Sequence, residues 1–424
     1  MHKVISFGIP SYNAAKDMDH CITSILEGSN YATDIEIIVV DDGSKDETAD
    51  KADEWEARYP GIIRAVHQEN GGHGIAVLSG LREAQGTYYK VVDSDDWLDA
   101  AALSTILSIL RGFEERDQRV DLFISNYVYE KVYEGTHTAI GYKFALPRKK
   151  IFSWDQIGHF RLDQNLLMHS LCYRTDVLRE SNLPMPPHTF YVDNIYAYVP
   201  LPRCKTMYYA DIDLYRYFIG REGQSVNEAT MVKRLDQQFR VTRIMMESYH
   251  LYSDVESSRL RSYMMGYFTM MMAICSVLTK LSEEDCADER LKTLWNDLKA
   301  YDERMYRRAR YGVVGFFTNL RGRAGLDHLA RIHDGHAVGN ARNHAEVMRN
   351  QDDGGVDLVF QLHQQIHNLR LNRHVQRRRR LVGNQQLRVA AERHGDHRAL
   401  AHTAGKLVRI LLGALLRVGD VDLL

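Results

Sequence analysis

Three aspartates that follow a short apolar segment form the clearest chemical feature of the sequence. The run Lys90–Asp99 reads KVVDSDDWLD, so Asp93, Asp95 and Asp96 lie within four positions. Carboxylates this close repel one another unless a cation lies between them. Hard divalent cations are held in this way, by one or two carboxylates together with substrate phosphates. The pattern therefore predicts a site for a metal-phosphate complex.

The same residues also have an ordinary structural interpretation. Asp and Ser are common in turns, and Asp96 or Asp99 could cap a helix that begins near Ala100. The location favours the ligand site, because open α/β sheets bind ligands at the carboxyl ends of their strands. The elements around the aspartates decide between the two interpretations.

Strand-like and helix-like segments alternate along the first 92 residues. Short apolar runs rich in β-branched residues occur at Val4–Ile9, Ile35–Val40, Ile62–Val66 and Tyr88–Val92. Segments of helical period separate them, at Met18–Glu27, Asp46–Arg58 and Ile75–Ala84. This alternation predicts an α/β fold with a doubly wound, mostly parallel sheet.

Polar residues gather where these predicted strands end. They are PSYN from Pro10, DDGS from Asp41, QENGGHG from Gln68 and the aspartates from Asp93. Because the carboxyl ends of parallel strands meet at one edge of a sheet, we expect the four segments to form one ligand site.

Beyond Asp121 the pattern becomes mixed and then helical. The expected elements are strands at Leu122–Val128 and Met207–Tyr217, a hairpin around Glu134–Phe144, a loop of prolines and aromatics at Pro184–Tyr191, and helices over residues 227–324. The charge-free, Met-rich run Ser262–Thr279 approaches the length of a membrane span. Its Ser, Tyr and Thr residues favour a buried or partner-facing helix instead.

The last hundred residues differ in composition from the rest. Ten of the 19 His lie from His328 onward, whereas Tyr, Trp and Pro are absent after Gly325 and Lys406 is the only Lys. Several residue classes change together, which favours a reading-frame shift near Arg321–Gly325. An out-of-frame tail would be loosely packed and dispensable. The competing interpretation is an Arg-rich extension that binds a partner.

Global composition excludes few functions. The formal net charge of −2 gives no argument for binding nucleic acid. Five scattered cysteines without a Cys-x-x-Cys pair argue against a zinc knuckle or a disulfide framework. The strand pattern begins at Val4, with no basic segment and cleavage site before it. We expect a cytoplasmic protein; association with the inner face of a membrane and a homodimer stay open.

The strand-end motifs, in their order along the chain, carry a resemblance. PSYN, VVDDGSxDxT, NxG and DSDD resemble the motifs of bacterial family 2 glycosyltransferases of GT-A fold. The later motifs YVDN at Tyr191 and RYxxGRxxQS at Arg216 are similar to those of one bacterial branch. The resemblance implies a catalytic domain at residues 1–226, followed by a helical domain at 227–324 and the Arg- and His-rich tail at 325–424.

The resemblance also implies an activity. A sugar would pass, with inversion, from a nucleotide-diphosphate sugar, expected to be a UDP-sugar, to a hydroxyl group. The acceptor would be a glycan, a lipid-linked molecule or another hydroxyl compound, as in the synthesis of bacterial cell-surface polysaccharides or glycoconjugates. Mg²⁺ or Mn²⁺ would be the cofactor and would neutralise charge that develops on the leaving diphosphate.

Residue roles carried over from the family fall on the motif positions. Tyr12 would stack on the nucleotide base, and Asp42 would accept a hydrogen bond from uracil N3–H, which suits an acceptor-only carboxylate. Asp93 would lie near the ribose or the metal, and Asp95 would bind the metal. The remaining donor-binding positions are Pro10, Asn70, Gly72 and Arg221. Asp42 could instead form an Asx-turn with Gly43, Tyr12 could pack in the core, and Arg221 could form a surface ion pair.

Asp193 matches the general base of the family, which takes the proton from the acceptor hydroxyl. The alternative for Asp193 is a helix N-cap before Ile195–Tyr198.

Two other functions compete with the glycosyltransferase. A sugar-phosphate nucleotidyltransferase would need a glycine-rich loop with Arg and Lys where PSYN stands. A non-catalytic module that binds a nucleotide-sugar stays open.

Overall fold

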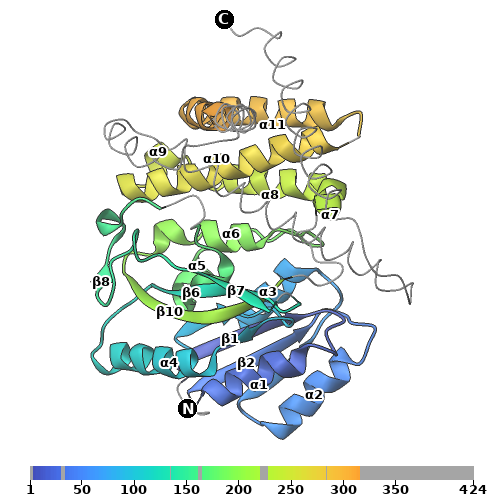
Figure 1. The fold of residues 1–424 in the computed structure, drawn as a ribbon, viewed down its shortest axis with the longest axis vertical. Helices are drawn as coiled ribbons and strands as arrows, with labels where there is room; N and C mark the ends of the chain where they lie inside the picture. The colour runs from blue at the N-terminus through green and yellow to red at the C-terminus, as the bar shows by residue number, and fades with distance from the viewer. Residues whose placement is uncertain are drawn as a thin grey trace, which may run out of the picture. The chain divides into compact units, whose positions relative to one another are not determined.

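The computed structural model describes residues 3–29, 34–133, 135–160, 165–219, 228–282 and 284–315 (Figure 1). The chain divides into two compact units, Met1–Met264 and Met265–Leu424. The predicted functional boundary between residues 226 and 227 stays a prediction. Arg221 and the tail from residue 325 lie outside the described residues.

A ten-stranded sheet forms the centre of the first unit, counted over the residues that the structure describes. Its parallel half has the order β3-β2-β1-β4. These strands are β1 (Ile5–Ser11), β2 (Ile35–Asp41), β3 (Ile63–His67) and β4 (Tyr88–Val91), which confirms the four predicted strands. β1 and β2 are buried along their whole length, as expected for strands covered on both faces.

The other half of the sheet is mixed. Its strands are β5 (Trp97–Leu98), β6 (Leu122–Lys131), β7 (Thr136–Ile140), β8 (Ile151–Phe152), β9 (Leu171–Arg174) and β10 (Met207–Phe218). β9 runs antiparallel to both β4 and β6, and β6 runs parallel to β10. The short strand β9, which we did not predict, thus joins the two halves. The predicted α/β fold with a mostly parallel sheet is confirmed.

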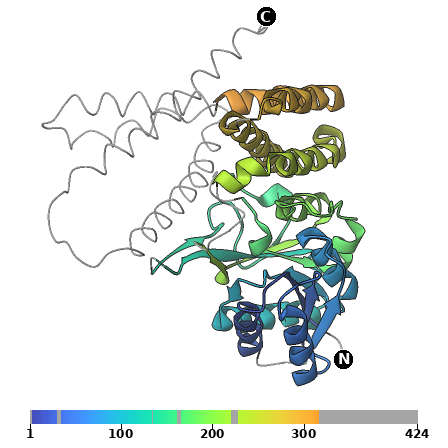
Figure 2. The same ribbon diagram turned by 90° about the vertical axis from the view of Figure 1, so that its right-hand side faces the viewer.

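Helices follow the strands as the periodicity predicted. They are α1 (Met18–Gly28), α2 (Thr48–Arg58), α3 (His73–Glu83), α4 (Ala100–Glu115), α5 (Thr175–Glu180) and α6 (Asp193–Tyr198), with 3₁₀ turns at Trp154–Gln156, Met168–Ser170 and Leu201–Arg203. Figure 2 shows α1 to α3 packed along the N-terminal strands. The side chain of Asp99 accepts a hydrogen bond from Ala102 N–H (3.0 Å), so Asp99 caps α4 and one of the two proposed caps is confirmed.

The segment after residue 227 is helical over its described residues, as predicted. It contains α7 (Glu228–Lys233), α8 (Leu235–Glu247), α9 (Leu251–Asp254), α10 (Ser258–Leu281), α11 (Ala287–Tyr301) and a helix over residues 303–315. α10 is long and apolar enough to cross a membrane, and 83% of its apolar window is buried. The hydroxyls of Thr269, Ser276 and Thr279 each donate to the backbone carbonyl four residues earlier, so this apolar helix satisfies them internally.

Candidate active site

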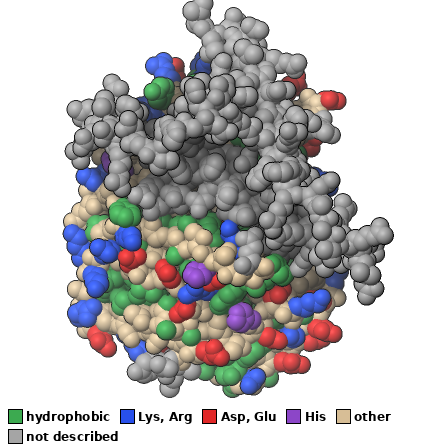
Figure 3. Space-filling model, viewed as in Figure 1, with side chains coloured by type: hydrophobic (Ala, Val, Ile, Leu, Met, Phe, Trp, Pro, Cys, Tyr) green, Lys and Arg blue, Asp and Glu red, His purple; other side chains and the backbone are tan. Residues whose placement is uncertain are grey.

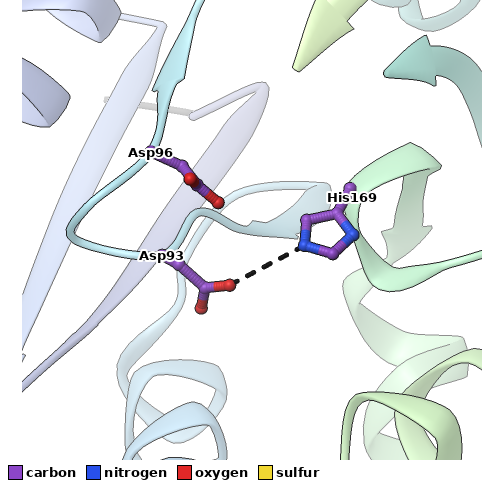
Figure 4. Close-up of side chains that lie close together, drawn as sticks. All are labelled: Asp93, Asp96 and His169. Carbon is purple, nitrogen blue, oxygen red and sulfur yellow. Dashed lines mark ion pairs between the residues drawn. The ribbon is translucent and has the colours of Figure 1, made fainter. Parts of the chain in front are cut away.

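Asp93 lies in the turn directly after β4 and makes one short contact with a histidine. Its Oδ1 is 2.8 Å from Nε2 of His73, and its Oδ2 is 3.9 Å from Nε2 of His169. Burial opposes ionisation of Asp93, but the charge and hydrogen bond of His73 outweigh it and hold the pKa of Asp93 below its usual value. One Asp93 oxygen is therefore engaged, and the other faces an imidazole beyond hydrogen-bond distance (Figure 4).

Asp96, three residues later, is held quite differently. It is 1% exposed, its Oδ2 accepts from the Tyr215 hydroxyl (2.7 Å), and its Oδ1 accepts from Phe218 N–H (2.9 Å). Burial and the nearby charges of Asp95 and Asp93 raise the pKa of Asp96 well above its usual value. Asp96 therefore fastens the turn to β10.

His169 sits in the 3₁₀ turn before β9, on the far side of the site from β1. Its side chain is 7% exposed, and its ring stacks on Tyr217 with centroids 4.6 Å apart. Lys90 Nζ donates to its backbone carbonyl (2.7 Å), which fixes the turn. Burial lowers the pKa of His169 to about 4, so the imidazole is neutral near pH 7. In the described part of the chain its Nδ1 has no hydrogen-bond partner.

These side chains could hold a divalent cation. Asp93, Asp96 and His169 offer ligand atoms that all lie within 4.8 Å of one another, and Figure 4 shows both carboxylates extending toward the ring. Carboxylate oxygens suit Mg²⁺ or Mn²⁺, and a neutral imidazole adds a nitrogen that a transition metal accepts. Asp93 and His169 suit such an ion, whereas both Asp96 oxygens already accept hydrogen bonds within the fold. Asp95, the predicted ligand, lies in the same partly buried turn and stays a prediction.

The carboxylate of Asp42 is enclosed by the loop that follows β3. Asp42 is 3% exposed. Its Oδ1 accepts from Gly71 N–H (2.8 Å) and Gln68 Nε2–H (2.7 Å), and its Oδ2 accepts from Gly72 N–H (2.7 Å). Asn70 Nδ2 donates to the Asp42 carbonyl (2.8 Å). The structure thus brings together Asp42, Asn70 and Gly72, three of the predicted donor-binding residues.

The turn after β2 is closed by Asp41, the residue before Asp42. Ser44 N–H donates to Asp41 Oδ1 (3.0 Å), whereas the Asp42 carboxylate accepts from Gly71 and Gly72, so the Asx-turn interpretation of Asp42 is not supported. The adjoining loop after β1 is tied to this turn, because Lys45 N–H donates to Asn13 Oδ1 (2.8 Å). Tyr12 in that loop is 49% exposed, so core packing does not explain it, while Pro10 is buried within β1.

Asp193 is the first residue of α6. Val192 is the N-cap, and no side chain caps this helix, so the cap interpretation of Asp193 is not supported. Burial raises the pKa of Asp193 to about 6, with His73 acting in the opposite direction and Asp93 adding to the rise. Asp193 therefore interacts electrostatically with the residues at the end of β4.

The loop that leads to Asp193 is fastened to the loop around Asp42. His188 N–H donates to the Gly71 carbonyl (2.8 Å). Gly72 has φ +87°, and a Cβ there would lie 2.8 Å from His188 N, so the close approach requires glycine. His188 (φ 47°) and Tyr191 (φ 66°) adopt left-handed backbone conformations, a strain that is common at functional sites.

Sequence reasoning missed two residues of this cluster. His73 lay inside the QENGGHG motif but received no role, and its position as the first residue of α3 was the available signal. His169 had no signal, because the strand that follows it was not predicted.

Other features lie apart from the cluster: a pocket of about 600 Å³ along α4 is lined by Phe113, Arg116 and Tyr208, among others. On the face in Figure 3, basic and acidic side chains are interspersed.

Part of the chain resembles a known family of proteins. The sequence model described as "Glycosyl transferase family 2" matches residues 6–167. Similar proteins include the uncharacterized glycosyltransferase EpsJ of Bacillus subtilis (strain 168), 38% identical over 101 residues, and the chondroitin synthase of Escherichia coli, 31% identical over 160 residues. These segments cover 24% and 38% of this chain but 28% and 22% of the relatives, so the chain spans less than a third of either relative.

A solved structure shares the fold. S. aureus TarS 1–349, in complex with UDP-GlcNAc, is similar with a TM-score of 0.53 and 16% sequence identity, over 73% of this chain and 87% of that one. The match supports the GT-A-like arrangement of sheet and helices. The motifs at the ends of β1 to β4 lie inside residues 6–167, the part of the chain that matches the model of glycosyl transferase family 2.

Proposed function

We propose that the chain is a metal-dependent, inverting glycosyltransferase that uses a UDP-sugar. The observation that carries the proposal is the cluster at Asp93. Asp93 and His169 offer atoms suited to a cation. The charge of Asp93 also acts on Asp193, whose pKa is raised to about 6, chiefly by burial. Perturbed carboxyl groups of this kind are typical of catalytic sites. The UDP-GlcNAc complex of TarS and the half-exposed Tyr12, which is available for stacking on a base, support the choice of donor.

In the proposed reaction each residue has a defined role. Tyr12 stacks on the base, and Asp42, which also holds the loop after β3, accepts a hydrogen bond from uracil N3–H. Asp93, Asp95 and His169 would hold the divalent cation, which when bound supplies Lewis-acid stabilisation of the leaving diphosphate. Asp193 takes the proton of the acceptor hydroxyl while the oxygen of that hydroxyl forms a bond to the anomeric carbon of the sugar. The carbon-oxygen bond to the diphosphate breaks on the opposite face, so the configuration inverts.

The remaining parts of the proposal concern organisation. We assign catalysis to residues 1–226 and propose Arg221 as a fork-shaped ligand for the diphosphate. Residues 227–324 would form the helical domain. The protein would be located in the cytoplasm, and its acceptor would be a glycan or a lipid-linked molecule. The second candidate is a module that binds nucleotide-sugar without catalysis. It is favoured by the three hydrogen bonds already made by the Asp42 carboxylate, which describe a well-ordered binding loop.

Replacement of the proposed base separates the two candidates. Asp193→Asn should reduce transfer by roughly 10²- to 10⁴-fold, because a general base acts only in the transition state. UDP-sugar binding, measured by calorimetric titration, should change little. Asp50→Asn on exposed α2 is the matched control and should retain full activity. Equal loss of binding and transfer would make Asp193 a donor ligand, and a wild-type chain that binds but never turns over would favour the module.

A further inference from the structure

We infer that His73 is a positioning residue that orients Asp93 for the divalent cation. The inference rests on the proposed function, since it assigns the residue that prepares the metal site. His73 and Asp93 form one of the short side-chain pairs of the cluster, at 2.8 Å between Nε2 and Oδ1. Their side chains are 33% and 22% exposed, so the pair stands at the edge of the site and is not part of the core.

The hydrogen bond from His73 gives the two Asp93 oxygens different roles. Because Oδ1 accepts from His73, rotation of the carboxylate is restricted and Oδ2 stays directed toward His169, 3.9 Å from its Nε2. That separation is too long for a hydrogen bond, but a cation with bonds of about 2.1 Å to oxygen can bridge two such atoms. Hydrogen bonds to metal-binding carboxylates commonly set their orientation and basicity.

The imidazole is itself held in place by the start of α3. Gly72, the N-cap residue, donates its N–H to Asp42 Oδ2 (2.7 Å), and Gly71 donates to Oδ1 (2.8 Å). On the other side, Gly71 accepts from His188 N–H (2.8 Å). The backbone beside His73 is thus fixed by both loops, which is the rigid support that a preorganised site needs.

Side-chain replacements distinguish positioning from packing. His73→Phe keeps a ring but removes the N–H donor, and His73→Gln restores an N–H on a chain of similar reach. His137→Ala is the matched control, because His137 is exposed on β7. Each variant is first compared with the wild type by its melting temperature, so that a folding defect is recognised.

The test is Mn²⁺ binding in the presence of UDP, followed by the loss of the free-ion signal in electron paramagnetic resonance. We expect His73→Phe to raise the Kd for Mn²⁺ about 10- to 100-fold, the usual cost of losing a hydrogen bond to a ligand. His73→Gln should recover most of the affinity, and His137→Ala should match the wild type. An unchanged Kd in His73→Phe, or equal losses in the Phe and Gln variants, would overturn the inference. A wild-type chain that binds no Mn²⁺ would instead overturn the metal-dependent function, and the inference with it.

Discussion

Two aspartates at the ends of the strands on either side of β1, Asp42 after β2 and Asp93 after β4, show how one residue type is used for two purposes. Asp42 is 3% exposed, and its carboxylate accepts three N–H groups, two of them from the backbone. The Asp93 carboxylate accepts one hydrogen bond, from His73, and lies beside Asp95 and Asp96. The first carboxylate is held by hydrogen bonds from its own chain, whereas the second belongs to a cluster of negative charge.

The difference separates stability from ligand binding. Hydrogen bonds from backbone N–H groups let Asp42 hold the loop without any other ligand. The carboxylates at the end of β4 repel one another and gain from a cation. We therefore expect changes at Asp42 to affect folding and changes at Asp93 to affect metal binding and catalysis.

The largest expected effect comes from Asp93→Asn. Loss of a charged ligand should reduce transfer at least about 100-fold, because the cation contributes several kcal/mol to the transition state. Without metal, the melting temperature should fall only modestly, since the amide oxygen can still accept the hydrogen bond from His73. Transfer assays and thermal melts in chelator measure both. A variant that melts well below the wild type would show that Asp93 has a structural role, as Asp42 does, and would contradict the proposed difference between them.

Asp42→Ala should show the opposite pattern. Removal of the carboxylate leaves Gly71 and Gly72 N–H groups without their acceptor, and each such loss costs about 1–3 kcal/mol. We expect the free energy of unfolding to fall by about 2–4 kcal/mol, measured by urea denaturation. Asp53→Ala, at a carboxylate that is 64% exposed, is the control and should change stability by less than about 1 kcal/mol. Unaltered stability in Asp42→Ala would refute the structural role.

The pH dependence of transfer should identify the third carboxylate, Asp193. Its pKa is raised to about 6, whereas that of Asp93 is lowered, so Asp93 remains ionised across the working range. A base acts when deprotonated, so kcat/KM should rise about tenfold per pH unit below pH 6 and level off above it. A rate profile that is flat between pH 5 and 7 would show that Asp193 is not the base.

The smallest effect is expected from Asp96→Asn. The pKa of Asp96 is raised well above its usual value, and its oxygens accept from Tyr215 and Phe218. An amide can keep the backbone contact and donate to the Tyr215 oxygen, so stability should change by less than about 1 kcal/mol. Mn²⁺ affinity should stay close to that of the wild type. A large drop in Mn²⁺ affinity would instead make Asp96 a ligand alongside Asp93.

Much of the fold could be predicted from the sequence, because β1 to β4 are short, apolar and separated by amphipathic helices. β9 could not, since four residues carry too little periodicity to mark a strand. The roles of Asp42 and Asp96 also lay beyond the sequence. Asp42 depends on N–H groups 29 and 30 residues away, and Asp96 on groups 119 and 122 residues away, so only the folded chain reveals them.

The site shows the same limit. The motifs led to Asp42, Asn70, Gly72 and Asp93, which the fold brings into one hydrogen-bonded cluster with His73. His169 reaches that cluster only because β9 pairs with β4 and Lys90 binds the carbonyl of His169. No local pattern around His169 indicates this pairing, because it joins segments 79 residues apart.

The most direct test of a metal-dependent donor site is the affinity for UDP with and without cation. Calorimetric titration of the full chain with UDP should give a Kd at least about 10-fold lower in Mn²⁺ than in excess chelator, because a cation held by the carboxylates would neutralise charge on the diphosphate. Asp95→Asn should remove most of this difference. Equal UDP affinity in Mn²⁺ and in chelator would contradict the account.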